Sequence, residues 1–240
     1  ARSLGDVAAL AEPMMMFDER DPDMHPLAAP RLAHVLEQAP PHPPRFAFVR
    51  TPAWDKASPD VAGGLEELRD VIGARAVWLE LPAAFAQGYT WHTQIANADF
   101  AVSLEREHQT GASSMSDSLR KQLDAGREIT AFDYQRAVKG ALALGELADE
   151  IFGEVDAIVT PAAPGEAPAG LDSTGDPIFA TLWTLTGLPA LSLPLLRGSQ
   201  GLPIGVQLVG RRGDDARLMR TARWLVEHVD TATSEGDRTP

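Results

Sequence analysis

The feature that most constrains the fold is a strand–helix–strand pattern in the first third of the sequence. Residues 46–49, Phe-Ala-Phe-Val, predict a buried strand. Apolar residues then recur at helical spacing from residue 61 to residue 72, and Gly73 follows as a helix-ending residue. Residues 77–82 predict a second strand. Two strands joined by one helix indicate a βαβ-like unit, so the sequence predicts an α/β fold.

The rest of the sequence continues with helices and short strands. Thr130 is a helix N-cap candidate with Asp133 three residues later, a weakened capping box. Beyond the first unit we expect helices at residues 7–14, 83–109, 113–126, 130–153, 179–186 and 213–229, and strands at residues 155–159, 191–195 and 204–209. The expected organisation is one domain over residues 1–230 and a polar, disordered tail at residues 231–240.

The composition excludes several classes of protein. The chain has 240 residues, a formal net charge of −13 and no Cys. No run of basic residues is longer than the two of Arg211-Arg212, so binding to nucleic acid or to an anionic membrane surface is not expected. Without Cys there is no disulfide framework, thiolate metal site or Cys nucleophile. No apolar run reaches the length of a membrane span and no signal-peptide pattern is visible, so we expect a cytoplasmic protein.

No complete catalytic constellation is visible. There is no Gly-x-Ser-x-Gly motif, and the Ser-rich residues 113–116 precede a helix, where N-capping explains them. The six His residues show no metal-ligand spacing, so we expect neither a metal nor another cofactor. Lys56, Lys121 and Lys139 stand in polar surroundings that would not lower a lysine pKa by desolvation.

One segment has the character of a ligand pocket. The expected strand at 155–159 runs into Thr160-Pro161, an irregular loop rich in Pro and Gly follows, and a short helix carrying Trp183 leads to the next strand. Loops at the carboxyl ends of strands are where α/β proteins bind ligands. Two interpretations stay open here, because Thr160-Pro161 can simply end a strand while Trp183 fills the core.

Four sequence blocks follow one another in an order that resembles the amidase signature family. They are Asp-Ala-Ile-Val-Thr-Pro at 156–161, Ala-Pro at 167–168, Leu-Thr-Gly-Leu-Pro-Ala-Leu-Ser-Leu-Pro at 185–194 and Gly-Leu-Pro-Ile-Gly-Val-Gln-Leu-Val-Gly at 201–210. Residues 1–8 and the expected helix after Gly126 resemble the family more loosely. The resemblance covers nearly the whole chain but only the carboxyl-terminal portion of the family.

The resemblance implies a fold and a division of labour. The family fold is a mixed β-sheet covered by helices on both faces. Its members hydrolyse amides with a Ser nucleophile, a bridging cis-Ser and a Lys base, all in the amino-terminal half, and no position here matches them. We therefore expect the isolated chain to be inactive, with no catalytic residue of its own. The resemblance implies that it contributes part of the substrate-pocket wall, for which the candidates are Thr160, Pro161, Asp176, Trp183 and Thr186.

The resemblance also implies which partners the chain could have. Subunits that amidate misacylated tRNA usually carry an Asn-Leu-x-Arg-Tyr-Asp-like run that helps to hold glutamine. Residues 97–102, Asn-Ala-Asp-Phe-Ala-Val, lack its Arg-Tyr, which favours an amidase acting on a small amide over an amidotransferase subunit. A non-catalytic split subunit is the alternative. In either case we expect an apolar face that is exposed in the chain alone. In the assembled protein an amino-terminal amidase half or a second copy of the chain would cover this face.

Overall fold

The fold is built around one mixed β-sheet. The computed structural model describes residues 1, 3–21, 24 and 26–236. Within them the strands are β1 (Phe46–Arg50), β2 (Ala76–Glu80), β3 (Ala157–Pro161), β4 (Ala190–Arg197) and β5 (Pro203–Val209). Their order in the sheet is β2-β1-β3-β5-β4. β1 is parallel to both β2 and β3, whereas β5 runs antiparallel to β3 and to β4. The expected α/β class with a mixed sheet is confirmed.

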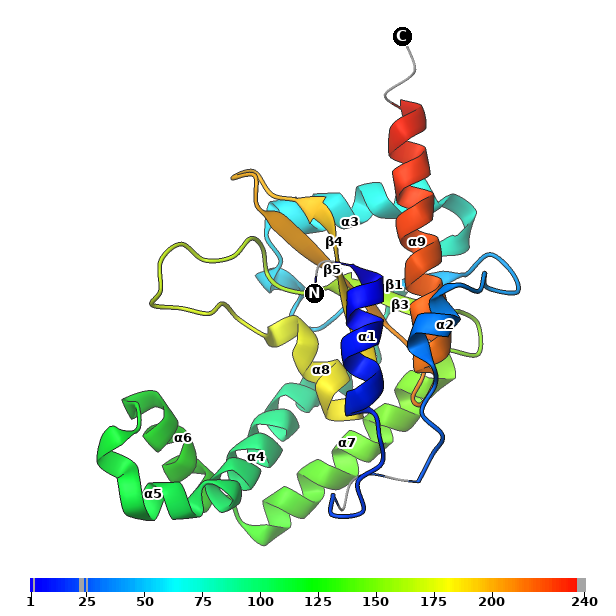
Figure 1. Cartoon of the computed structure of the whole chain (residues 1–240). Coiled ribbons are helices and arrows are strands. Elements are labelled where there is room, and N and C mark those ends of the chain that lie inside the picture. Colours follow the sequence, from blue (N-terminus) through cyan, green and yellow to red (C-terminus); the bar gives the residue numbers. More distant parts are fainter. Residues whose placement is uncertain (2, 22–23, 25, 237–240) are drawn as a thin grey trace.

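Helices cover both faces of this sheet (Figure 1). They are α1 (Leu4–Met14), α2 (Leu32–Leu36), α3 (Pro59–Ile72), α4 (Phe85–Ser103), α5 (Glu105–Gly111), α6 (Asp117–Arg127), α7 (Ala131–Ile151), α8 (Ile178–Thr186) and α9 (Asp215–Gly236). Short 3-10 turns occupy Trp54–Lys56, Gly73–Arg75 and Ala112–Ser114. Helices α3 and α9 pack on one face, and α4, α7 and α8 pack on the other.

The two faces of β1 show why the sheet is buried on both sides. Phe46 and Phe48 join the core under α3 and α9, whereas Ala47 and Val49 join the core under α7 and α8. Successive side chains of a strand point to opposite faces. All four are fully buried, so this run of apolar residues fits a parallel strand covered on both sides.

Local signals fix several helix ends. Ser58 accepts a hydrogen bond from the N–H of Val61 at the start of α3, and the next residue, Pro59, occupies the first turn. Thr130 caps α7 by accepting from the N–H of Asp133 at 3.1 Å. At the end of α8, Gly187 takes the left-handed conformation with a φ of 65°, which a glycine adopts without strain.

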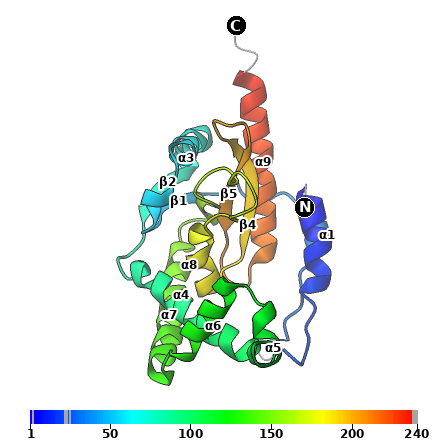
Figure 2. The same cartoon turned by 90° about the vertical axis from the view of Figure 1, so that its left-hand side faces the viewer.

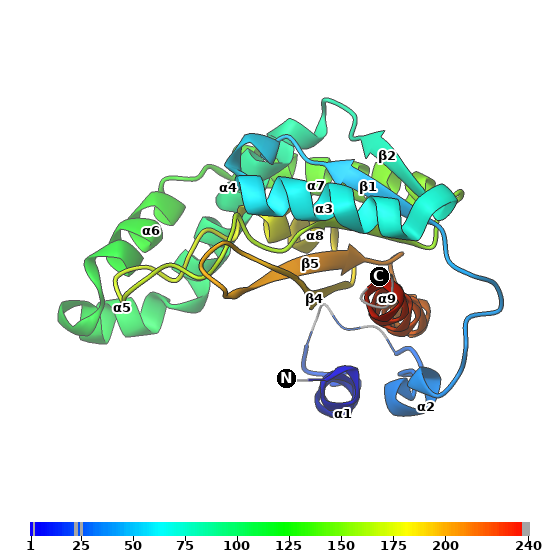
Figure 3. The same ribbon diagram turned by 90° about the horizontal axis from the view of Figure 1, so that it is seen from above.

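Helices α1 and α2 form a third layer, which packs against α9. Ala8 of α1, together with Leu32 and Val35 of α2, packs against Met219 of α9. Figure 3 shows α1 and α2 beside α9. The Arg223 guanidinium also donates a hydrogen bond to the backbone carbonyl of Leu36.

The helices α5 and α6 form an arm that projects from the body (Figure 1). The arm packs mainly on α4. Gly126 lies where α6 crosses α4, and a Cβ atom built on it would approach the carbonyl oxygen of Asn97 to 2.0 Å. The absence of a side chain at Gly126 therefore permits this close crossing.

Two features differ from the sequence expectation. Helix α9 continues to Gly236, into the segment expected to be a disordered tail, because no Gly or Pro interrupts it after Asp215; residues 237–240 lie outside the described part of the chain. Leu10 and Met14, which belong to the apolar pattern of the first helix, are 62% and 79% exposed. None of the helices among the described residues combines the length and apolar character needed to span a bilayer.

Candidate functional site

The five pocket-wall candidates do not converge on one open cavity. Thr160 and Pro161 end β3, and both are buried within the chain. Trp183 lies on α8, is 1% exposed and belongs to the core between this helix, α7 and the sheet. Thr186 is also buried, and its hydroxyl donates to the backbone carbonyl of Leu182 at 2.8 Å. Thr160, Pro161 and Trp183 are covered by their own chain, whereas Thr186 belongs to the lining of a cleft of about 260 Å³. A role of these four residues in binding substrate stays a prediction.

Asp176 is the exposed member of the five. Its Oδ1 accepts a hydrogen bond from the N–H of Ile178 at 3.0 Å, at the first turn of α8. A carboxylate at this position satisfies a helix-terminal N–H and complements the helix dipole. The geometry accounts for Asp176 as a local cap, and its contact with a ligand stays a prediction.

Thr160 nevertheless belongs to an unusual row of polar side chains. It pairs in register with Gln207 of β5, which in turn pairs with Ser192 of β4. Thr160 Oγ1 and Gln207 Oε1 are buried without a hydrogen-bond partner among the described residues, as is Trp183 Nε1. Buried polar groups are nearly always hydrogen-bonded. The row therefore marks unused hydrogen-bonding capacity at the end of β3.

A second polar pair lies beyond the end of β1. Thr51 directly follows this strand and is 3% exposed, and its hydroxyl lies beside that of Tyr89 on α4. Burial raises the pKa of the Tyr89 phenol, while Thr51 and the backbone of Ala53 act in the opposite direction. Because β1 and β3 are parallel neighbours, their carboxyl ends lie at the same edge of the sheet. Both sets of polar groups thus lie at the edge where α/β proteins bind ligands.

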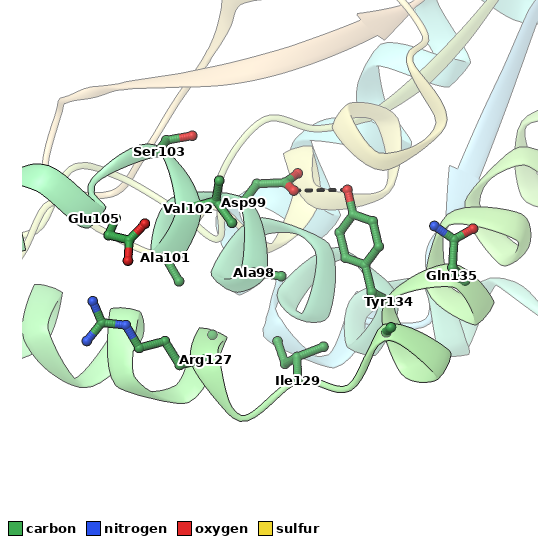
Figure 4. Close-up of a pocket in the computed structure, with 12 residues that line it drawn as sticks. Ala98, Asp99, Ala101, Val102, Ser103, Glu105, Arg127, Ile129, Tyr134 and Gln135 are labelled. Atoms are coloured by element: carbon green, nitrogen blue, oxygen red, sulfur yellow. Dashed lines mark hydrogen bonds between the residues drawn. The ribbon is translucent and has the colours of Figure 1, made fainter.

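A large open cleft lies between helices, away from these buried groups. It has a volume of about 840 Å³ and lies between the second half of α4 and the connection from α6 to α7 (Figure 4). Its lining residues are Ala98, Asp99, Ala101, Val102, Ser103, Glu105, Gly126, Arg127, Ile129, Ala131, Tyr134 and Gln135. The apolar members come from both sides of the cleft, with Ala98, Ala101 and Val102 on α4 and Ile129 on the connection from α6 to α7 (Figure 4), and the charged members come from different helices.

The polar groups of this cleft are suited to binding. The Tyr134 hydroxyl donates to Asp99 Oδ1 at 2.9 Å and so orients the carboxylate. Figure 4 shows Glu105 and Arg127 on opposite sides of the space, with the guanidinium directed toward the carboxylate. Arg127 also lies 3.8 Å from Asp124. The lining includes one Ser, Ser103, but no Lys or His that would activate it.

The sequence provides only a partial indication of this cleft. Residues 97–102 are the stretch compared above with the glutamine-holding run of amidotransferase subunits, and Ala98, Asp99, Ala101 and Val102 of this stretch line the cleft. The helical spacing of Tyr134, by contrast, predicts only a place on the buried face of α7. The contact between Asp99 and Tyr134 joins residues 35 positions apart, and no local spacing could predict it. Among the described residues, no group of three or more His, Asp or Glu side chains could hold a metal ion.

Comparison with known proteins identifies the family. The sequence model of the Amidase family matches residues 1–219. The A-type subunit of the glutamyl-tRNA(Gln) amidotransferase of Cupriavidus necator is 32% identical over 142 residues, covering 55% of this chain and 26% of the relative. The protein of the same name from Rickettsia bellii is 24% identical, covering 95% of this chain and 54% of the relative.

A solved structure agrees with this assignment at the level of the fold. The 6-aminohexanoate cyclic dimer hydrolase superposes with a TM-score of 0.77 at 18% identity, over 97% of this chain and 55% of the hydrolase. The chain spans about half the length of the relatives that it matches from end to end. Since the family model covers most of the chain and the fold agrees, this protein belongs to the amidase signature family.

Proposed function

We propose that this chain is the carboxyl-terminal portion of an amidase-type amidohydrolase that cleaves the C–N bond of a small carboxamide. In this proposal the chain supplies scaffold and one wall of the substrate site. The nucleophile and the base come from the half of the family fold that the chain does not span. The observation that carries the proposal is the family match over residues 1–219, combined with an open cleft of about 840 Å³ whose lining contains no nucleophile–base pair.

The chemistry of amide hydrolysis explains this division. Attack on a carboxamide needs a nucleophile whose proton is removed by a base, and donors that stabilise the resulting oxyanion. A chain with a binding cleft alone can hold an amide but gains nothing toward the transition state. The isolated chain is therefore expected to bind without turnover.

The test measures turnover of a simple arylamide such as acetanilide. The purified 240-residue chain should release no amine above a buffer blank. The chain co-expressed and purified with the unmatched half of the Rickettsia bellii relative should release amine if that half supplies the missing groups. Turnover by the isolated chain would refute the division of labour.

Binding to the cleft is a separate readout. Replacement of Asp99 by Asn removes the charge that Tyr134 orients, so it should weaken the binding of an amide with a cationic group, measured by calorimetry. Replacement of Lys139 by Gln, on the exposed side of α7 and outside the cleft lining, is the matched control and should leave binding unchanged. Equal affinities for the Asp99 variant and the parent would remove the cleft from the proposal.

A second candidate function is that of an amidotransferase A-type subunit. It is favoured by the names of the sequence relatives, which are A-type subunits of glutamyl-tRNA(Gln) amidotransferases. The two functions differ in the first ligand, because the amidotransferase takes the amide nitrogen from glutamine. Calorimetric binding of glutamine, with no binding of acetanilide, would support the amidotransferase over the amidase.

A further inference from the structure

A small cleft lies among three helices on one face of the sheet. Helices α4, α7 and α8 pack against one another, and they lie together below the sheet in Figures 1 and 2. The cleft between them is the one of about 260 Å³ that Thr186 lines. Pockets for drug-sized ligands measure about 300–1,000 Å³, so this cleft fits a smaller molecule. Its lining residues are Ile95, Val138, Ala141, Leu142, Thr184, Leu185, Thr186, Gly187 and Arg212.

The lining combines apolar walls with one charge. Ile95 of α4, Val138 of α7 and Leu185 of α8 supply aliphatic side chains from three helices. Leu142 is 56% exposed, so one edge of the cleft is accessible to solvent. Arg212, which follows β5, is the only charged residue among the lining residues. The cleft shares no lining residue with the larger cleft of about 840 Å³, so it is a separate site.

Two glycines make room for the guanidinium of Arg212. Its Nη2 donates a hydrogen bond to the backbone carbonyl of Thr186 at 2.5 Å. A Cβ atom built on Gly145 of α7 would overlap this Nη2, and one built on Gly187 would lie 3.9 Å from Nη1. The guanidinium therefore lies between α7 and the end of α8, with Nη1 toward Gly187 at the lining of the cleft.

The charge of Arg212 has no acidic partner within the described part of the chain. None of the ion pairs there includes Arg212. Asp214, the acidic residue nearest to it in the sequence, pairs instead with Arg217 at 2.9 Å. A guanidinium has five N–H donors in a planar fork, and the bond to Thr186 uses one of them. The other donors match the two oxygens of a carboxylate.

Capping of α8 explains only part of this arrangement. A cation that bonds the last carbonyls of a helix complements the helix dipole, and Arg212 does so at Thr186. The carbonyls of Trp183 and Thr184 are already bonded by the N–H groups of Leu188 and Gly187, at 3.1 and 3.2 Å. Capping thus accounts for a cation at this place, but it does not account for the apolar cleft beside the cation.

We propose that this cleft binds a small monocarboxylate with a compact apolar chain. The carboxylate lies on the guanidinium of Arg212, and the chain packs against the aliphatic side chains of α4, α7 and α8. A single cation selects one carboxylate rather than two. The net charge of −13 opposes an anion only weakly here, because salt screens exposed charges beyond about 8 Å. The inference does not depend on the proposed function, because it concerns a different cleft.

The test is a titration of the 240-residue chain with 3-methylbutanoate at neutral pH, followed by nuclear magnetic resonance. The backbone N–H of Gly187 and the Nε–H of Arg212 should shift and saturate together. We expect a dissociation constant on the order of 1 mM, which is the affinity that a ligand of few atoms reaches. Acetate lacks the apolar chain and 3-methylbutanamide lacks the charge, so each should bind about tenfold more weakly.

Substitutions of the basic pair test the role of the guanidinium. Arg212→Gln should weaken binding of 3-methylbutanoate by about tenfold or more, because a charge-assisted pair of hydrogen bonds is lost. Arg212→Lys keeps the charge without the fork, so its affinity should be intermediate. Arg211→Gln is the matched control, since it makes the same change of charge at the neighbouring residue, outside the lining, and should leave binding unchanged.

A second variant leaves Arg212 in place and so stays informative if Arg212→Gln unfolds. Leu142→Asp puts a negative charge at the exposed edge of the cleft, and it should weaken binding by repelling the carboxylate. Leu10→Asp makes the same change on α1, where Leu10 is 62% exposed and outside the lining, and should have no effect.

Four results would overturn the proposal. They are shifts that do not saturate, equal affinity of the acid and its amide, equal affinity of the Arg212→Gln and Arg211→Gln variants, and shifts confined to Asp99 and Tyr134. The last result would place the ligand in the larger cleft instead. Loss of acetanilide binding or turnover would affect the proposed function alone, because that readout does not involve Arg212.

Discussion

Replacement of Gly126 by Ala should destabilise the chain even though alanine is the better helix former. Gly126 lies in the last turn of α6, where this helix crosses α4. The new Cβ would lie 2.0 Å from the carbonyl oxygen of Asn97 and 2.6 Å from its carbonyl carbon. Both atoms belong to the backbone of α4, so rotation of a side chain cannot relieve the overlap.

The size of the effect follows from two opposing contributions. An ordinary contact between such atoms is about 3.5 Å, so the two helices must separate by more than about 1 Å. Forcing extra atoms into a packed interface costs about 1–3 kcal/mol, whereas Gly to Ala within a helix contributes up to about 1 kcal/mol. We expect a net loss of about 1–2 kcal/mol in the free energy of unfolding, because the cost of the overlap exceeds the gain in helix propensity.

Gly63 provides the matched control. It lies in α3, and a Cβ built on it would meet no atom within 4 Å. Gly63→Ala should therefore stabilise the chain by about 0.5–1 kcal/mol. The assay is urea denaturation followed by circular dichroism, together with amide exchange in α6, which should become faster in Gly126→Ala because the arm packs mainly on α4. The reasoning fails if both alanine variants stabilise the chain.

Three further changes have defined outcomes. Gly187→Ala should lower the free energy of unfolding by about 1–2 kcal/mol, because its φ of 65° is left-handed and strains an alanine; the urea midpoint measures this, and an unchanged midpoint would contradict it. Burial lowers the pKa of the His92 imidazole in the folded chain. As the pH falls, the unfolded chain is therefore protonated at His92 before the folded chain is. The contribution of His92 to the free energy of unfolding should consequently be fully retained above about pH 6.5 and be lost as the pH drops below this value. His92→Gln should show a smaller fall between about pH 7.5 and pH 5, and an identical fall would exclude His92 as a cause. Glu166 accepts hydrogen bonds from the N–H groups of Leu202 and Gln200 at 2.7 and 3.3 Å, so Glu166→Ala should speed amide exchange at both positions. Glu166→Gln retains one acceptor and should have the smaller effect; equal exchange in both variants and the parent would count against this anchoring role.

The sequence predicts local elements well where their cause is local. The end of α3 at Gly73, where φ is 67°, depends on a residue type that acts within a few positions, and the sequence predicts it. The same holds for Thr130 before α7 and for Gly187 after α8. Family membership is also recognisable, because its sequence blocks are ordered along the chain.

Features that depend on distant contacts are beyond such patterns. The antiparallel pairing of β3 with β5 and the meeting of Asp99 with Tyr134 both depend on how the elements pack in three dimensions. Leu10 shows that an apolar helical pattern does not by itself tell whether a side chain is buried, because this residue is exposed. Its spacing with Val7 predicts an apolar helix face, but only the structure shows that this part of the face is uncovered by the chain itself.

The joining of α1 and α2 to α9 has a consequence for the order in which the chain folds. The hydrogen bond between Leu36 and Arg223 closes a loop of 187 residues, and Ala8 and Val35 pack on Met219. During synthesis α1 and α2 can pack on each other, but they lack their partner on α9 until that helix emerges from the ribosome. Contacts of such high sequence separation form late and leave apolar surface uncovered in the interim. The segment that carries α1 and α2 must therefore wait for α9, and over that interval the side chains that α9 will cover stay in contact with water.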